Sequence, residues 1–282
     1  MSLLFLLAAG LVLNAAASVL ALWRGSVDPG GAIVGIAVGT VIFAAGGPLF
    51  WLILMAFFIS STALGWVRPA EKEALKAIHQ KGNRRDLFQV LANGGMGTLM
   101  ALIYGLTHDP AWALGFAVSF ASSNADTWAS ELGVLSRGNP VSLPSLRPVP
   151  RGISGGVSAA GCAASFGGAV FIALIFAAEN LSLRILTGGF IRVAAFVAGA
   201  GFLGSLVDSV LGGTVQAQYV PANGGAKPGG FILLVTERAF TDEGIPNRLA
   251  RGLAFVTNDV VNFASCAAVT IAAVLLSRLV LL

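Results

Sequence analysis

Long apolar runs separated by short polar segments extend through the whole of this sequence. The first of them, residues 2–22, contains no charged side chain. A run of about 20 apolar residues is long enough to cross the hydrocarbon core of a membrane as an α-helix. Because lipid offers no hydrogen-bond partners, a segment inside it must pair its backbone groups internally, and a helix does so within a single segment. We therefore expect an all-α, polytopic membrane protein.

The composition supports this fold class. Of the 282 residues, 56% are hydrophobic and only 11% are charged, whereas a soluble domain is usually about one quarter charged. The mean hydropathy is +0.84. The length allows a bundle of about seven or eight transmembrane helices, and the 36 glycines suit close packing between such helices. We expect a single integral-membrane domain over residues 1–282.

Prolines and polar loops divide the chain into expected spans. Pro48 follows two glycines inside an apolar stretch, and proline inside a helix breaks or kinks it. Residues 31–66 should therefore form two short spans, with one kinked, re-entrant pair as the alternative. The expected spans are residues 2–22, 31–45, 48–66, 87–106, 111–135, 154–178, 189–211 and 252–280.

The basic residues predict the orientation of the chain. Most of the 17 Lys and Arg residues fall on one side of the expected bundle, in the loops at residues 23–30, 67–86, 136–152 and 212–251. Cytoplasmic loops carry the excess of Lys and Arg in membrane proteins, so these four loops should be cytoplasmic. The first run lacks a basic start and an A-x-A-type cleavage site, which predicts a span and not a removable signal peptide. We expect a multi-pass protein of the cell inner (plasma) membrane.

A polar stretch at residues 121–133 gives the strongest functional signal. It places Asp126 and Glu131 in a segment that should lie in the membrane, together with several Ser, Thr and Asn residues. Ionisable side chains at that depth are costly and by default mark a functional site. At helical spacing the polar residues form two neighbouring stripes, one through Asp126 and one through Glu131, and hence a broad polar wedge.

Three other expected spans are polar at the same, cytoplasmic end, which predicts one inward-facing polar cavity. Four carboxylates without a basic residue beside them in these spans would repel one another unless they were protonated or neutralised. Carboxylate and amide oxygens are hard ligands that suit Mg²⁺. We therefore expect a Mg²⁺ cofactor, bound by Asp126, Glu131, Asp208 and Asp259.

Simpler explanations exist for individual polar residues. Asn and Ser in membrane helices often only join helices through hydrogen bonds, which is an equal alternative for Asn93 and Ser205. A lone Asp could pair with an Arg at the membrane interface.

The expected cytoplasmic loops supply positive charge. Arg147 and Arg151 lie in the loop at residues 136–152, and Arg pairs well with phosphate groups. Arg151-Gly-Ile-Ser-Gly-Gly then opens an expected span, where a Gly/Ser turn would direct backbone N–H groups at an anion. Lys227 lies in a Gly-rich segment for which a plain flexible loop is an equal alternative. The site as a whole suits a phosphorylated lipid together with a nucleotide, and nothing points to a nucleic-acid partner.

Several segments resemble one integral-membrane family, in the same order along the chain from about residue 28 to residue 270. This family contains phytyl-phosphate (prenyl-phosphate) kinases of plants and cyanobacteria and an animal transmembrane branch. The segments are Gln89-Val-Leu-Ala-Asn-Gly-Gly, Ala125-Asp-Thr-Trp-Ala-Ser-Glu-Leu-Gly, Val149-Pro-Arg-Gly-Ile-Ser-Gly-Gly-Val-Ser, Gly204-Ser-Leu-Val-Asp-Ser-Val-Leu-Gly and Thr257-Asn-Asp-Val-Val-Asn-Phe.

The resemblance implies a phosphotransferase that converts a membrane prenyl monophosphate, phytyl or geranylgeranyl phosphate, into its diphosphate, with CTP as the donor. The site residues that it implies are Asn93, Asp126, Glu131, Arg151, Asp208, Asn258 and Asn262. Of these we expect Asp126, Glu131 and Asp208 to be catalytic. Substrate and nucleotide should be bound by Asn93, Arg147, Arg151, Lys227, Asn258 and Asn262.

Other functions fit parts of the pattern. A transporter or flippase for a polyprenyl phosphate could couple the same acidic cavity to H⁺ or Na⁺. The polar groups cluster at one end and not at the midplane, which disfavours transport. A membrane scaffold is disfavoured because it would not need membrane carboxylates without evident partners. A cytidylyltransferase would use similar chemistry and would differ from the kinase in its products. The sequence leaves the oligomeric state open, a homo-oligomer included.

Overall fold

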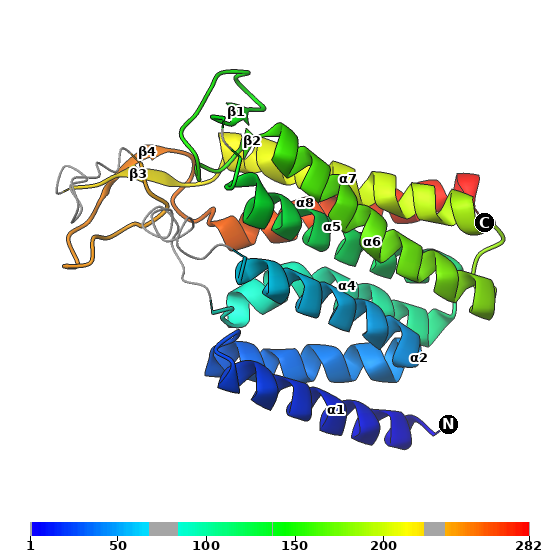
Figure 1. The fold of residues 1–282 in the computed structure, drawn as a ribbon. Helices are drawn as coiled ribbons and strands as arrows, with labels where there is room; N and C mark the ends of the chain where they lie inside the picture. The colour runs from blue at the N-terminus through cyan, green and yellow to red at the C-terminus, as the bar shows by residue number, and fades with distance from the viewer. Residues whose placement is uncertain (1, 68–83, 137, 223–234, 282) are drawn as a thin grey trace.

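The computed structural model describes residues 2–67, 84–136, 138–222 and 235–281. Long helices run side by side in one bundle, and the described loops with secondary structure gather at one end of it, opposite the two chain termini (Figure 1). We call this end the loop end. The helices are α1 (Leu3–Trp23), α2 (Pro29–Gly65), α4 (Leu87–Thr107), α5 (Pro110–Gly133), α6 (Ala159–Leu183), α7 (Phe190–Thr214) and α8 (Asn258–Val280).

Helix α2 folds back on itself. Gly31 near its start and Thr62 near its end both contact Arg85: a Cβ on Gly31 would lie 2.3 Å from the Arg85 carbonyl oxygen, and Arg85 Nη1 donates to Thr62 Oγ1 at 3.2 Å. In a straight helix these two residues would be about 46 Å apart. The reversal occurs at Gly47, which has a φ of 78° and precedes Pro48. The predicted break is confirmed, and whether each half crosses the membrane stays a prediction.

Six of the described helices are long and apolar enough to cross a membrane: α1, α2, α4, α6, α7 and α8. Helix α5 is 24 residues long but is not among them, because its second half carries the polar stretch. The expected all-α, polytopic membrane fold is confirmed. The number of seven or eight spans stays a prediction.

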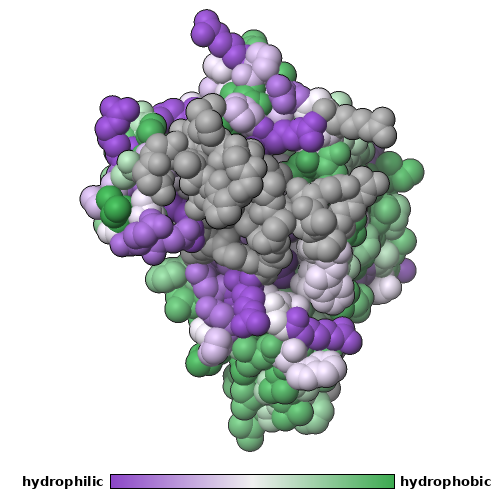
Figure 2. All heavy atoms as spheres, turned by 60° about the vertical axis from the view of Figure 1, so that its left-hand side comes forward, coloured by the Kyte–Doolittle hydropathy of each residue, from purple (hydrophilic) through white to green (hydrophobic). Residues whose placement is uncertain are grey.

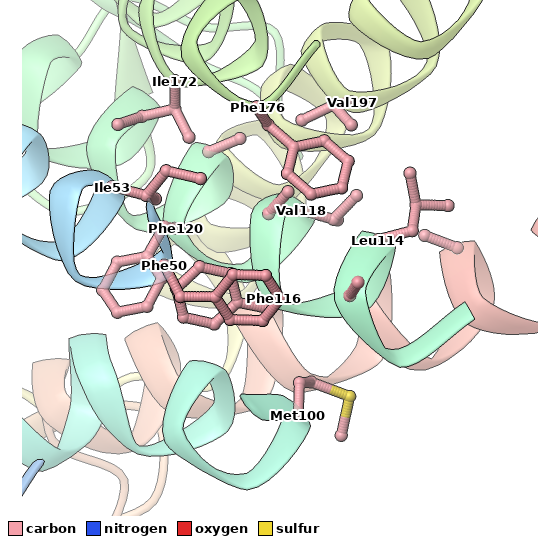
Figure 3. Close-up of a cluster of buried hydrophobic side chains, with 14 of the residues drawn as sticks. Phe50, Ile53, Met100, Leu114, Phe116, Val118, Phe120, Ile172, Phe176 and Val197 are labelled. Atoms are coloured by element: carbon pink, nitrogen blue, oxygen red, sulfur yellow. The ribbon is translucent and has the colours of Figure 1, made fainter. Parts of the chain in front are cut away.

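Helix α5 is the central helix of the bundle. Residues 113–125 are all buried, and α5 packs against α2, α4, α6, α7 and α8. The ring centroids of Phe116 and Phe50 from α2 stack 4.3 Å apart, and Phe120 joins the same cluster (Figure 3). Since aromatic burial is a large stabilising contribution, this cluster anchors the apolar half of α5 and so fixes the position of its polar half.

Glycine permits the close approach of α7 to α5. A Cβ on Gly201 would lie 2.6 Å from the Ala121 Cβ, and one on Gly204 would lie 2.0 Å from the Ser122 Oγ. The same face of α7 carries Ser205 and Asp208, which are also buried. The small residues therefore bring Asp208 next to α5.

Two small antiparallel sheets lie at the loop end (Figure 1). Strand β1 (Val141–Ser142) pairs with β2 (Gly156–Val157), and β3 (Gln218–Val220) pairs with β4 (Arg248–Arg251). Two helices near these strands begin later than predicted. Helix α6 begins five residues later than expected because β2 occupies the preceding segment, and α8 begins after β4, where Thr257 caps it.

Candidate active site at the loop end

A cleft with a volume of about 160 Å³ opens between α5, α6 and α7 at the loop end. Its walls include Asp126 from α5, Asp208 from α7, Asn258 from α8, and Arg151 and Ser154 from the loop before α6. Hydrophilic side chains gather on this face of the molecule, whereas apolar surface covers the helices below it (Figure 2). The cleft therefore brings together acidic and basic groups that are far apart in the sequence.

The carboxylate of Asp208 is held by two side chains of α8. Ser265 Oγ donates to Asp208 Oδ2 at 2.9 Å. With its amide nitrogen turned toward the carboxylate, Asn262 donates to the same oxygen at 3.0 Å and to the Asn258 carbonyl at 3.1 Å. Asp208 is only 9% exposed. Hydrogen bonds to a charged acceptor are stronger than neutral ones, so α8 fixes the orientation of this carboxylate.

Two further carboxylates act electrostatically on Asp208, namely Asp126 and Glu237. Carboxylates that share a site repel one another unless a proton or a cation neutralises them. Among the described residues no group of three or more His, Cys, Asp or Glu side chains could hold a metal ion. Mg²⁺ is usually bound by one or two carboxylates, water and substrate phosphates, and Asp126 and Asp208 fit that requirement.

The structure places Glu131 away from Asp126. Glu131 Oε1 lies 3.9 Å from where a Cβ on Gly65 of α2 would be, and its charge acts on Arg85, which precedes α4. Five residues along a helix correspond to a rotation of about 140°, so the two carboxylates leave α5 in different directions. Asp259 lies in the first turn of α8 and does not line the cleft.

Part of the polar wedge on α5 joins helices. The buried amide of Asn124 donates to the Gly168 carbonyl on α6 at 2.8 Å and accepts from Ser60 Oγ on α2 at 3.1 Å. The side-chain amide of Asn93 donates to the Gln89 carbonyl of its own helix, and the backbone carbonyl of Asn93 accepts from Ser123 Oγ. Asn124 thus joins helices. Of the two residues for which the sequence offered that alternative, Asn93 lies outside the cleft and Ser205 lines it.

The loop before α6 lines the cleft with the groups expected to bind an anion. Arg151, Ser154 and Ser158 all border the cleft, and Ser158 caps α6 by accepting from the Gly161 N–H at 3.1 Å. A helix N-terminus attracts anions, so Arg151 and α6 provide positive potential opposite the carboxylates. Of the other predicted basic residues, Arg147 is exposed and does not line the cleft, and Lys227 lies outside the described residues.

Backbone geometry locks this loop against α7. Gly155 has a φ of 85°, and a Cβ there would lie 2.3 Å from the Gly213 Cα. A residue with a side chain would be both strained at this φ and without room. The loop and the end of α7 are therefore one packed unit.

Glu237 and its partner Gln216 were missed by the sequence analysis. Gln216 Nε2 donates to Glu237 Oε1 at 2.8 Å, and Ser154 Oγ donates to the same oxygen. Both residues are buried, with Gln216 1% exposed. They lie in the segment expected to be an irregular loop, where no periodic pattern marks buried positions. The one signal is the apolar run at residues 231–235, which is separated from Glu237 by Thr236 alone.

Ser165 on α6 was also missed. It lines the cleft and is 2% exposed, and its Oγ has no hydrogen-bond partner in the part of the chain that the structure describes. A buried hydroxyl without a partner is costly, so a ligand in the cleft could complete its hydrogen bonding. This makes Ser165 a candidate ligand contact.

These features belong to a multi-pass membrane protein with a polar cleft at one end of its helices. The chain belongs to the family described as integral membrane protein DUF92, which matches residues 12–270. This confirms the membrane family predicted from the motifs. No solved structure matches the chain.

Relatives occur in plants and cyanobacteria. The chain is 32% identical to Protein PGR of Arabidopsis thaliana over 216 residues, which covers 68% of this chain and 73% of that protein. It is 31% identical to the uncharacterized membrane protein sll0875 of Synechocystis sp. over 64% of this chain and 69% of that protein. It is 29% identical to Protein VTE6, chloroplastic, of Arabidopsis thaliana over 49% of this chain and 43% of that protein.

Proposed function

We propose that this protein is a phosphotransferase that moves a phosphoryl group from a nucleoside triphosphate, CTP, to a membrane prenyl monophosphate such as phytyl or geranylgeranyl phosphate. The observation that carries the proposal is the cleft itself, in which Asp126 and Asp208 face Arg151 and the N-terminus of α6. Paired carboxylates opposite an anion-binding wall suit two phosphate groups held with a divalent cation. The choice of a prenyl acceptor and of CTP follows from the sequence motifs.

In this mechanism the protein acts mainly by positioning. Asp126 and Asp208 would hold Mg²⁺, which supplies charge neutralisation at the transferred phosphoryl group. Ser265 and Asn262 keep Asp208 oriented. Arg151 and the N–H groups at the start of α6 would bind the donor phosphates, with Asn258 at the opposite wall of the same cleft.

The chemical step needs no strong general base. A phosphate monoester has a second pKa of about 6, so an acceptor oxygen is already ionised near neutral pH. This oxygen attacks the terminal phosphorus of the donor, the bond from that phosphorus to its bridging oxygen breaks, and a nucleoside diphosphate leaves. Positioning and electrostatic stabilisation then carry the catalysis. The loop end would face the cytoplasm, where nucleotides are available.

The direct test uses purified protein with CTP, Mg²⁺ and geranylgeranyl or phytyl monophosphate. We expect a prenyl diphosphate and CDP, whereas pyrophosphate release would indicate a cytidylyltransferase. Asp126→Asn should abolish turnover, and Glu243→Gln, at an exposed carboxylate that does not line the cleft, should retain it. The proposal fails if wild-type protein forms no diphosphate, or if Asp126→Asn is as active as wild type.

One observation favours the alternative of an ion-coupled transporter. Glu179, near the opposite end of α6, is 5% exposed, and neither carboxylate oxygen has a hydrogen-bond partner among the described residues. Buried carboxylates in membrane helices often serve proton or ion pathways. However, Ile172 and Phe176 lie between Glu179 and the cleft along α6 and are fully buried apolar residues. A kinase consumes CTP in detergent, whereas transport of a polyprenyl phosphate requires sealed vesicles, so the two functions are separable.

A further inference from the structure

A second cavity, of about 80 Å³, lies between α1, α2 and α4 and is not used by the mechanism above. Along α1 its wall runs from Asn14 through Ala17 to Ala21, a distance of about 10 Å at helical rise. Val38, Leu54 and Phe57 form much of the opposite wall. The cavity is therefore a narrow apolar space that extends from the loop end toward the middle of the bundle.

Small side chains leave this space open, and Asn14 closes its inner end. At Gly35 a Cβ would have only Ser18 Oγ within 4 Å, at 3.6 Å. One turn deeper, a Cβ on Gly39 would lie 1.9 Å from Asn14 Oδ1, so the helices are in full contact there. Asn14 is itself fixed by hydrogen bonds to the Gly10 carbonyl and from Trp51 Nε1. The inner end of the cavity is therefore closed by a hydrogen-bonded side chain in close contact with α2.

We expect the side of the cavity between α1 and α4 to face lipid. Helix α1 packs extensively on α2 and, in the described part of the chain, on no other helix to a comparable extent. Its other faces carry exposed apolar residues such as Val12 and Val19. Since α1 and α4 both line the cavity but do not pack closely on each other, an apolar chain can enter between them from the membrane.

The loop end of the cavity is occupied by the guanidinium of Arg85. Its Nη1 donates to Thr62 Oγ1 at 3.2 Å, and the charge lies 5.4 Å from the ring centre of Phe58 and 5.9 Å from that of Phe57. Burial lowers the pKa of Arg85, while the charge of Glu131 on α5 acts in the opposite direction. Arg has five N–H donors, and the hydrogen bond to Thr62 uses one of them. Within the described part of the chain, Arg85 therefore has donors without a hydrogen-bond partner at the edge of a mostly apolar cavity.

We propose that this cavity binds one single-chain membrane amphiphile, with its apolar chain between α1, α2 and α4 and its anionic head group at Arg85. Charge and shape both match such a ligand, because a cation stands at the polar end and most of the accessible wall surface is apolar. Four polar residues also border the cavity, namely Asn14, Ser18, Gln89 and Asn93. The identification of this amphiphile as the acceptor lipid rests on the proposed function. Helix α5 presents Glu131 toward Arg85 and Asp126 to the cleft, so both proposed binding sites lie at the loop end of α5.

Photo-crosslinking of the wild-type protein tests the placement of the chain. The probe is geranylgeranyl monophosphate with a diazirine at the end of its chain, added to the full-length protein in phosphatidylcholine nanodiscs without nucleotide. We expect adducts on residues 14–21 of α1 or 31–38 of α2. Adducts confined to other helices would overturn the assignment.

A second test compares the binding of radiolabelled geranylgeranyl monophosphate, without a diazirine, to the wild-type protein and to variants of the cavity. Ala17→Phe and Gly35→Leu should each weaken binding at least tenfold by filling the space, whereas Ala16→Phe, on the exposed face of α1, should change it less than twofold. Arg85→Gln should reduce the preference for the phosphate over geranylgeraniol at least fivefold. Wild-type affinity in both filled variants would refute the proposal.

These measurements separate the inference from the proposed function, because binding is measured without CTP. If the probe labels the cavity but no diphosphate forms with CTP, the kinase proposal fails and the cavity assignment stands. If diphosphate forms and the adducts lie elsewhere, the cavity assignment alone fails.

Discussion

The hydroxyl of Ser265 on α8 lies 2.9 Å from Oδ2 of Asp208 on α7 and donates to it. A hydrogen bond to a charged group contributes about 1.5–3 kcal/mol, which is enough to decide the orientation of a ligand carboxylate. Ser265→Ala should therefore lower kcat by about tenfold or more and raise the Mg²⁺ concentration needed for half-maximal activity. The matched control is Ser277→Ala on the same helix, since Ser277 donates only to the Val274 carbonyl. An unchanged Mg²⁺ requirement in Ser265→Ala would argue against Asp208 as a metal ligand.

Glu237 should act as a positioning residue for the loop that binds the donor. Glu237→Ala removes the common acceptor of Ser154 and Gln216, and we expect the KM for CTP to rise about tenfold with a smaller change in kcat, because a lost buried hydrogen bond costs about 1–3 kcal/mol. Glu237→Gln retains an acceptor oxygen and should restore most of the affinity. Glu243→Ala, at an exposed loop position, is the control. A purely structural role would reduce the yield or melting temperature without moving KM.

The two cysteines should differ in reactivity toward a thiol reagent. Cys162 lines the cleft, whereas Cys266 is 2% exposed. N-ethylmaleimide should therefore add once to the folded protein, at Cys162, as measured by intact mass, and Cys162→Ala should take up no label. CTP with Mg²⁺ should slow the labelling. Labelling at an undiminished rate with saturating CTP would contradict donor binding in this cleft.

Asp109 and Arg278 connect the start of α5 to the end of α8 at the end of the bundle opposite the loops. Partial burial acts to raise the pKa of Asp109, but hydrogen bonds from the Ala111 N–H and Arg278, together with the charge of Arg278, hold this pKa below its usual range. A carboxyl with a depressed pKa stabilises the fold above its unfolded pKa of about 3.9, and this contribution is lost as the pH falls through the folded pKa.

Asp109→Asn tests this pair, because Asn also caps a helix well but cannot form the ion pair. The melting temperature in detergent should be slightly lower than that of wild type at pH 7, consistent with about 0.2–1 kcal/mol for an exposed pair. The difference should begin to shrink as the pH falls below about 4 and should disappear only below the folded pKa of Asp109. A difference that persists at low pH would assign the effect to the cap and not to the charge.

The sequence was sufficient for those parts of the fold that depend on local chemistry. The break at Gly47 and Pro48 follows from backbone restrictions, and the buried small face of α7 follows from helical spacing. The early expected starts of α6 and α8 were wrong, because β2 forms before α6 and a turn at residues 252–257 comes before α8. Apolar composition could not indicate β2, since this strand is stabilised by pairing with β1, which is more than ten residues away. The single domain over residues 1–282 stays a prediction.

The candidate site was predicted in part. Helical spacing grouped Asp126 with Asp208 at one end of the bundle, and both line the cleft. Helical spacing does not determine how α5 is rotated about its axis relative to its neighbours. The interaction of Glu131 with Arg85 could therefore not be predicted from the sequence. Glu237 could not be found either, because its partners come from two other loop segments. The identities of metal, donor and acceptor stay predictions.

The amide of Asn124 sets the rotation of α5 about its own axis. It contacts α6 through the Gly168 carbonyl and α2 through Ser60 Oγ, so only one angular setting of α5 satisfies both partners. Asp126 is two residues further along, about 200° around the helix, and therefore points away from Asn124 and into the cleft. A wrong setting would leave a buried amide unpaired, which is costly in a membrane interior. The direction of the Asp126 carboxylate is thus determined by Asn124, a neighbouring side chain that takes no part in the chemistry. We expect substitutions at these two positions to be correlated among related proteins.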